Sequence, residues 1–179
     1  SAAHLPGPTH APGSALVTQE FHLARIDAHW LPAAYRPISI DARGARVLPG
    51  STSLLLNDPL TGLSYVVQSE VANPSKDVLE AVTMSDLDAM SADLALPSNF
   101  SGRARGYAQV VTANAQTPYD RALALMNSFR PPLFTYDTSV DLGTTANALD
   151  KFLFETHRGF CEQYAAAFAE LARSIGLPT

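Results

Sequence analysis

The chain has 179 residues, enough for one domain with a substantial core or for two small domains. Hydrophobic residues make up 46 % and charged residues 16 %, a composition typical of a folded protein and contrary to global disorder. The formal net charge is −5 and the 12 Lys and Arg residues are scattered, so charge argues against nucleic-acid binding.

The beginning of the chain differs from the rest. Residues 1–14 are rich in Pro, Gly, His and Ala without periodicity, and we expect them to form a disordered lead-in. They carry no signal peptide, and no apolar run of the chain is long enough to span a bilayer. We interpret the chain as an excised piece of a longer protein. A single cysteine cannot close an internal disulfide, so cysteine usage does not define the compartment.

Residues 15–96 are predicted to form a β-rich unit. Apolar and polar residues alternate over 15–23, which is typical of a half-buried strand. Further β-like pieces lie at residues 38–40, 45–48, 52–56 and 64–70, separated by turn residues at 43–44, 49–50, 57–59 and 61–62. Trp30 is interpreted as a core aromatic.

The end of this unit is ambiguous in the sequence. Residues 76–96 can continue the β unit or hold a short helix capped around Ser85. The carboxylates of Asp86, Asp88 and Asp93 suggest a metal site. They lack the glycine and the closing glutamate of a calcium loop, so we interpret them as a solvated face and predict no metal.

Residues 97–179 are predicted to be mostly helical. One helix is expected within residues 100–113, and a second begins with Thr117 as N-cap and Pro118 in the first turn. Pro131-Pro132 ends the second helix. Its predicted apolar stripe consists of Ala122, Leu123, Met126 and Phe129.

A short extended piece, 134–136, precedes two further helices. Thr144 or Thr145 is expected to cap the first, whose inward residues are Leu149, Phe152 and Leu153. Gly159 then supplies a flexible joint, and an apolar, alanine-rich helix follows from Cys161 to Ile175 and stops at Gly176.

Cys161 is the residue on which the functional prediction depends. At a helix start its sulfur lies among backbone N–H groups that have no intrahelical partner, and the helix dipole favours the thiolate. A thiolate beside a base is a nucleophile. The alternative is a buried structural thiol on an alanine-rich helix, because free cysteines are among the most buried residues.

The residues around Cys161 resemble the cysteine motif of transglutaminase-like proteins, in particular a bacterial membrane-anchored branch. The matching residues are Thr156-His157-Arg158-Gly159-Phe160-Cys161-Glu162-Gln163-Tyr164-Ala165, followed by Phe168, Leu171, Ala172, Arg173, Gly176, Leu177 and Pro178. Trp30-Leu31-Pro32 resembles a run that often precedes the catalytic domain in the same family. The resemblance implies an α+β fold, in which an N-terminal antiparallel β unit is followed by the helical N-terminal half of a papain-like core.

The resemblance also implies an activity. Cys161 would attack an amide carbonyl to give a thioester, which an amine or water then resolves, with a histidine as base and an aspartate that orients it. In the family these two residues follow the cysteine helix, yet residues 162–179 contain neither. We therefore expect this chain to be inactive by itself. Weaker candidates for lining the site are Arg158, Phe160, Glu162, Gln163 and Tyr164.

His157 could replace the missing base if one continuous helix joined it to Cys161, four residues later. Gly159 lies between them, so we do not favour this dyad. We predict that the substrates are proteins or peptides and that no cofactor is needed. The parent protein is expected to be extracytoplasmic and anchored to the membrane. Self-association is expected through apolar surface around Phe168 and Leu171. The alternative function is a non-catalytic interaction domain in which the β unit is the working surface.

Overall fold

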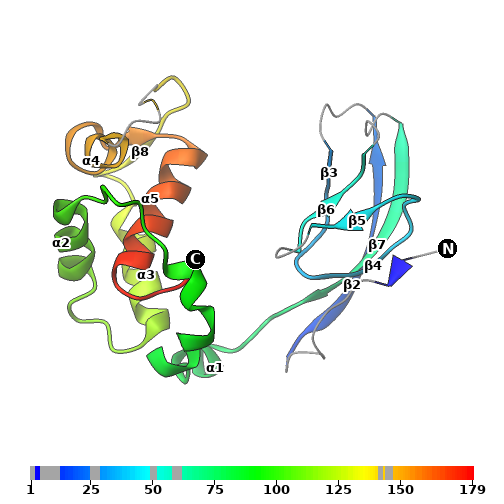
Figure 1. Cartoon of the computed structure of the whole chain (residues 1–179), viewed down its shortest axis with the longest axis horizontal. Helices are drawn as coiled ribbons and strands as arrows, with labels where there is room; N and C mark the ends of the chain where they lie inside the picture. Colours follow the sequence, from blue (N-terminus) through cyan, green and yellow to red (C-terminus); the bar gives the residue numbers. More distant parts are fainter. Residues whose placement is uncertain are drawn as a thin grey trace. The chain divides into compact units, whose positions relative to one another are not determined.

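The computed structural model describes residues 3–4, 13–24, 29–48, 52–57, 62–140, 143 and 147–179. The chain divides into two compact units, Ser1–Ser75 and Lys76–Thr179. The first unit consists of antiparallel strands and the second is mainly helical (Figure 1). The predicted α+β fold class is therefore confirmed.

Two antiparallel sheets make up the β unit. The larger sheet has the order β1-β4-β7-β2, and the smaller has the order β3-β6-β5. The strands are β1 Ala3–His4, β2 Ala15–Leu23, β3 Trp30–Leu31, β4 Pro37–Ile40, β5 Arg46–Val47, β6 Leu54–Leu55 and β7 Leu63–Val71.

The long pair β2–β7 fixes the register of this unit, running from Ala15 opposite Val71 to Leu23 opposite Leu63. Side chains of β7 alternate: Tyr65 and Val67 are buried, while Val66 between them faces outward. This alternation is what one buried sheet face requires. The buried apolar residues of the unit are Leu23, Leu31, Ile40, Ala42, Leu54, Leu56, Tyr65 and Val67.

Three expectations for the β unit need correction or stay open. The lead-in is not wholly without structure, because Ala3–His4 pairs with β4, while residues 1–2 and 5–12 lie outside the described residues. The interpretation of Trp30 as a core aromatic was wrong: it is 53 % exposed, and its neighbour Leu31 is buried instead. The turns expected at 49–50, 58–59 and 61 lie outside the described residues.

The helical unit contains five α-helices, two helices of other types and a two-stranded parallel sheet among its described residues. Helix α5 packs against both α2 and α3 (Figure 1). The elements are α1 Lys76–Glu80, η1 Met84–Leu94, α2 Gly102–Val111, α3 Pro118–Ser128, β8 Thr135–Tyr136, α4 Ala148–Lys151, η2 Phe152–Thr156, β9 Arg158–Gly159 and α5 Cys161–Ser174.

The division between the units falls earlier than the boundary expected after residue 96. Residues 76–94 fold as α1 and η1, and Met84 and Leu87 pack against the helical core. Thr83, not Ser85, begins η1, because its N–H donates to the Asp86 carboxylate at 2.8 Å. Asp86, Asp88 and Asp93 are exposed, as a solvated face requires.

Helix α3 begins as the sequence predicts. The Thr117 hydroxyl accepts a hydrogen bond from the Asp120 N–H at 3.0 Å, and the Asp120 carboxylate accepts one from the Thr117 N–H at 3.2 Å. The predicted stripe was partly wrong: Met126 is 43 % exposed, and Leu125 is the fully buried residue of this helix. The caps proposed at Thr144 or Thr145 lie outside the described residues, and Asn147 is the N-cap of α4.

The core of the helical unit surrounds α5. Phe134, Phe152 and Leu171 are almost fully buried, and Phe168 packs against the same cluster. The expectation that Leu171 and Phe168 form an exposed apolar surface was therefore wrong.

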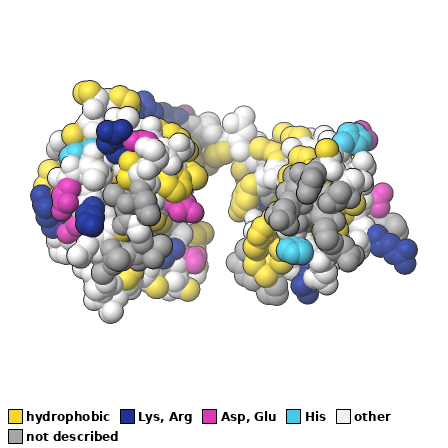
Figure 2. Space-filling view, turned by 90° about the horizontal axis from the view of Figure 1, so that it is seen from above, with side chains coloured by type: hydrophobic (Ala, Val, Ile, Leu, Met, Phe, Trp, Pro, Cys, Tyr) yellow, Lys and Arg dark blue, Asp and Glu magenta, His cyan; other side chains and the backbone are white. Residues whose placement is uncertain are grey.

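Hydrophobic side chains nevertheless reach the surface of both units (Figure 2). In the helical unit they include Leu133, two residues before β8, and Tyr136 within β8, which are 54 % and 62 % exposed. On the face that Figure 2 shows, Lys and Arg are spread over the surface without gathering in one patch. Among the described residues, no helix combines the length and the hydropathy needed to cross a bilayer.

Candidate active site

Cys161 is the first residue of α5, and its side chain is exposed. The residue before it, Phe160, has extended backbone (φ −119°, ψ −166°), so the helix begins abruptly. The N-cap Phe160 has no side-chain acceptor, and among the described residues no side chain accepts from the N–H groups of residues 161–163. These N–H groups therefore remain available to an acceptor that approaches the sulfur. The alternative of a buried structural thiol is wrong.

Gly159 lets the chain approach α5 closely. A Cβ atom at this position would lie 2.9 Å from the Gln163 Cβ and 3.1 Å from the Phe152 Cε2. Gly159 is buried and forms strand β9 with Arg158, parallel to β8. The prediction of a flexible joint was wrong, because glycine is needed here for space within an ordered strand.

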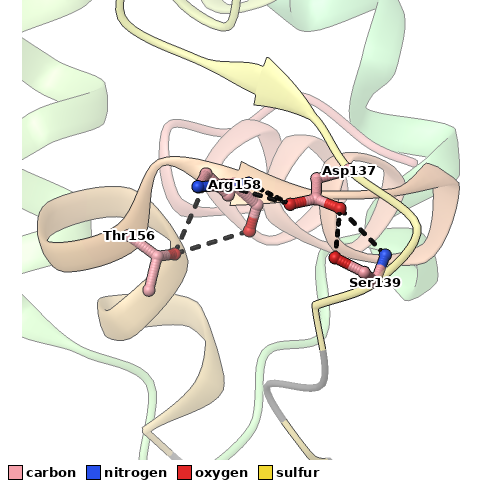
Figure 3. Close-up of polar contacts among 4 residues, drawn as sticks. All are labelled: Asp137, Ser139, Thr156 and Arg158. Carbon is pink, nitrogen blue, oxygen red and sulfur yellow. Dashed lines mark hydrogen bonds and ion pairs between the residues drawn. The ribbon is translucent and has the colours of Figure 1, made fainter.

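An ion pair holds the two short strands together (Figure 3). Arg158 donates from Nε and Nη2 to Asp137 Oδ2, at 3.0 and 2.6 Å. Asp137 Oδ1 accepts from the Ser139 hydroxyl at 2.7 Å and from the Ser139 N–H at 2.9 Å. The hydrogen bonds from Ser139, together with Arg158, lower the pKa of Asp137 to about 2. The carboxylate is therefore charged at all ordinary pH values, and Arg158 is engaged in this pair.

Backbone hydrogen bonds add to the same connection. The Asp137 N–H donates to the Gly159 carbonyl at 2.7 Å, and the Thr135 N–H donates to the His157 carbonyl at 2.9 Å. The backbone N–H of Arg158 donates to the Thr156 hydroxyl at 3.4 Å (Figure 3). The segment that leads to Cys161 is thus tied to β8 through main chain and side chains.

The other residues expected near the cysteine have separate positions. Gln163 Oε1 accepts from the Phe160 N–H at 3.0 Å and so fixes the start of α5. Tyr164 packs its ring on Phe152 and Tyr136, with centroids 5.0 and 6.1 Å away, and burial raises its pKa. Glu162 is exposed in the first turn.

His157 does not form a helical pair with Cys161. Its backbone is left-handed (φ 50°) and ends η2, so β9 separates the two residues. Its ring meets Phe134 edge to face, with centroids 5.0 Å apart. The condition for the dyad, a continuous helix, is absent.

A cavity of about 410 Å³ lies beside the first three turns of α5. Helix α5 contributes Glu162, Gln163, Ala166, Ala167 and Glu170 to its wall. The other lining residues are Pro97, Asn99, Phe100, Ser101, Gly143, Ala148, Leu149 and Phe152. Cys161 is next to this wall in the sequence but does not itself line the cavity.

Comparisons with known proteins agree with this arrangement. Residues 105–179 match the family model of the transglutaminase-like superfamily. The crystal structure of the periplasmic domain of TgpA from Pseudomonas aeruginosa superimposes with a TM-score of 0.67 at 26 % identity. That match covers 92 % of this chain and 54 % of that one. Residues 105–179 of this chain are therefore similar to the transglutaminase-like superfamily.

Further relatives are similar to this chain over different lengths. A second TgpA structure, bound to ethylmercury, matches 98 % of this chain and 58 % of that one (TM-score 0.65, 26 % identity). A protein-glutamine gamma-glutamyltransferase from P. aeruginosa is 36 % identical over 86 residues, 48 % of this chain and 13 % of the relative. The uncharacterized protein YebA from Bacillus subtilis is 29 % identical over 144 residues, 79 % of this chain and 18 % of the relative. The chain thus spans just over half of the structures and less than a fifth of the curated relatives.

Sequence reasoning missed Asp137, Ser139 and Glu170. The spacing of Asp137 and Ser139 is that of a turn in which an aspartate accepts from the residue two positions on, and this signal could have been used. The partnership of Asp137 with Arg158 joins residues 21 positions apart and has no local signal. Glu170 lies on a helix whose face toward the cavity is defined only by the packing of the unit.

Proposed function

We propose that Cys161 is the nucleophile of an enzyme that acts on amide bonds of proteins or peptides through a thioester. The observation that carries this proposal is an exposed sole cysteine at the first residue of α5, held by β9 and its ion pair with Asp137. It lies within the residues that match the superfamily. Structural cysteines are usually buried, whereas a nucleophile must be accessible.

The chemistry follows from the position of the thiol. The Cys161 Sγ attacks the carbonyl carbon of an amide, and the carbonyl oxygen becomes an oxyanion that the uncapped N–H groups of the first turn of α5 stabilise. The amine leaves with a proton, and a thioester remains on Sγ. An incoming amine gives transamidation, and water gives deamidation or proteolysis.

The proton transfers need a base, and the family resemblance assigns them to a histidine oriented by an aspartate. Residues 162–179 contain neither, and His157 is placed against Phe134. We therefore expect no turnover from the 179 residues alone. We propose that the base is supplied in a longer protein that contains these residues.

The test uses the longer protein and a primary amine with a fluorescent label. We expect the amine to be incorporated into a glutamine-containing peptide, with ammonia released, and Cys161→Ala to abolish both. Thr138→Ala, an exposed change outside the site, should leave the rate unchanged. Unchanged incorporation by the Cys161→Ala protein would overturn the proposal.

Location and partners belong to the same proposal. A relative is described as a periplasmic domain, so we place this chain outside the cytoplasm, in a parent anchored to the membrane. Its partners are protein or peptide substrates. Self-association remains a prediction, and the exposed Leu133 and the β8 residue Tyr136 replace Phe168 and Leu171 as the expected contact.

A second candidate function is a non-catalytic interaction domain. A cavity of about 410 Å³ in the β unit supports it, since two exposed aromatic residues, Trp30 and Tyr35, are among its lining residues. Aromatic-lined grooves are common sites for extended peptides. If the longer protein binds peptides, loses this binding with Trp30→Ala, and shows no Cys161-dependent turnover, this second function is the correct one.

A further inference from the structure

The cavity beside α5 carries negative charge without a balancing cation. Glu162 and Glu170 line it, and no Lys, Arg or His is among the described lining residues. Neither carboxylate takes part in a hydrogen bond or ion pair with the described residues. Burial raises the pKa of Glu170, an effect that Arg173 only partly opposes.

Arg173 is directed elsewhere. Its Nη1 donates to the Ala95 carbonyl at 3.0 Å, and its Nε donates to the Thr179 carbonyl at 3.0 Å. The cation that lies nearest to Glu170 in the sequence is therefore already hydrogen-bonded to main-chain oxygens. Glu170 remains partly desolvated without a direct partner, a state that a bound cation would relieve.

A third carboxylate lies behind the cavity wall. Asp150 Oδ2 accepts from the hydroxyl of Ser101, a lining residue, at 3.0 Å. Its other oxygen, Oδ1, is buried without a hydrogen-bond partner among the described residues. Unsatisfied buried acceptors are rare, and this one adds to the negative potential beside the cavity.

The remaining walls select an organic cation over a metal ion. Phe100, Leu149 and Phe152 provide an apolar surface that methylene groups can contact. Glu162 and Glu170 are separated by eight residues, about 12 Å along a helix axis. No group of three metal-ligating side chains lies within reach of one ion among the described residues. A long aliphatic stem with a terminal positive charge fits these features.

We propose that this cavity binds a lysine-like side chain of the substrate, with its ammonium group at Glu170 and its aliphatic stem along Ala166 and Phe152. The wall begins at Glu162, the residue after Cys161, so the cavity would select substrates with a basic residue beside the attacked amide. The assignment of the bound side chain to a substrate rests on the proposed function. Binding of the cation to the cavity does not rest on it and can be tested separately.

The binding test uses the 179-residue chain with Cys161→Ala, labelled with ¹⁵N, and two probes. Nα-acetyl-lysine amide carries the ammonium group, and Nα-acetyl-norleucine amide is the matched neutral stem. We expect the lysine probe to shift amide signals of the lining residues in α5, α4 and residues 97–101. The norleucine probe should bind about tenfold more weakly or not at all. Equal binding of the two probes, or shifts confined to other residues, would overturn the proposal.

Matched variants locate the charge. Glu170→Gln keeps the shape of the side chain and should weaken the lysine probe about three- to tenfold. Glu155→Gln makes the same change at an exposed glutamate outside the cavity and should have no effect. Ala166→Leu, which narrows the cavity, should weaken both probes. If Glu170→Gln is folded and binds the lysine probe with unchanged affinity, the proposal is contradicted.

Activity of the longer protein separates this inference from the proposed function. If Cys161→Ala abolishes amine incorporation but the lysine probe does not bind, the inference fails and the function stands. If the probe binds and Cys161→Ala changes no activity, the cavity is a cation site but not a substrate subsite. When both hold, a peptide with lysine beside its glutamine should react faster than one with norleucine, and Glu170→Gln should remove this preference.

Discussion

Arg158 directs two nitrogens, Nε and Nη2, to the same oxygen of Asp137, at 3.0 and 2.6 Å. The second oxygen of this carboxylate is bound by Ser139, so its orientation is fixed from both sides. Arg158 lies three residues before Cys161, so the pair anchors the segment that leads into the cysteine helix. Its consequences can be measured without a substrate.

The first prediction concerns pH and the Asp137 carboxylate. The pKa of Asp137 is lowered to about 2 by Ser139 and Arg158, against about 3.9 for an unfolded aspartate. A lowered carboxylate pKa contributes stability above the unfolded value, and this contribution is lost as the pH falls toward 2. The melting temperature of Asp137→Asn should therefore lie below that of the original chain by a constant amount from pH 5 to 8. Below about pH 4 the difference should shrink.

The control for this prediction is Thr138→Ala, which changes the exposed residue between Asp137 and Ser139. Its melting temperature should follow that of the original chain at every pH. A difference for Asp137→Asn that is the same at low and neutral pH would show that the carboxylate charge does not contribute.

The second prediction concerns the reactivity of the thiol. Because Cys161 is exposed and is the only cysteine, the native chain should bind one equivalent of ethylmercury, a soft cation that prefers thiolate ligands. Mass spectrometry of the native protein measures the stoichiometry. The Cys161→Ser chain should bind none. If the original chain reacts only after urea is added, the thiol is shielded and the proposed role of Cys161 loses its support.

How far the sequence predicts this molecule depends on the range of the interaction. The start of α3 at Thr117 and that of α5 at Cys161 were predicted, because caps, breakers and motifs are local signals. The α+β order of the chain followed from the change in hydrophobic period. The inward residue of α3 was misassigned, since Leu125 and Met126 are adjacent and only tertiary packing chooses between them.

The candidate site was predictable only at its centre. A single cysteine before an apolar helix could be recognised in the sequence, but the Asp137–Arg158 pair and the cavity at Glu170 could not. Both depend on segments that folding brings together: β8 with β9, and α5 with residues 97–101 and 148–152. Gly159 was recognised as special for the wrong reason, since its freedom of rotation is less important than the space it leaves.

The third prediction concerns Tyr65 in the β unit, whose hydroxyl donates to the Pro32 carbonyl at 2.6 Å. Burial raises the pKa of Tyr65 to about 12. Because the pKa is raised, the neutral phenol contributes to stability below about pH 10, which is the pKa of an unfolded tyrosine. This contribution is lost as the pH rises toward 12. Tyr65→Phe should lower the stability at pH 7 by about 1 kcal/mol through the lost hydrogen bond.

Ultraviolet titration of the phenolate checks this assignment. The difference between the original chain and Tyr65→Phe isolates one of the six tyrosines, and its midpoint should lie well above that of a free phenol. A midpoint near 10 would mean that the Tyr65 hydroxyl is solvated in solution.

The fourth prediction concerns Gly159 and distinguishes space from flexibility. In Gly159→Ala the new methyl group would lie 2.9 Å from Gln163 Cβ and 3.1 Å from Phe152 Cε2, so strand β9 and the first turn of α5 must move apart. Overpacking of this kind costs about 1–3 kcal/mol in the free energy of unfolding.

Gly106 in α2 is the matched control, because a Cβ there would meet nothing within 4 Å. Gly106→Ala should stabilise the chain by about 0.5–1 kcal/mol through helix propensity. Urea unfolding followed by circular dichroism at the helix band measures both variants, and the two changes must have opposite signs. If Gly159→Ala were as stable as Gly106→Ala, the close contact between β9 and α5 would not exist in solution, and Cys161 would lack the fixed position that its proposed chemistry requires.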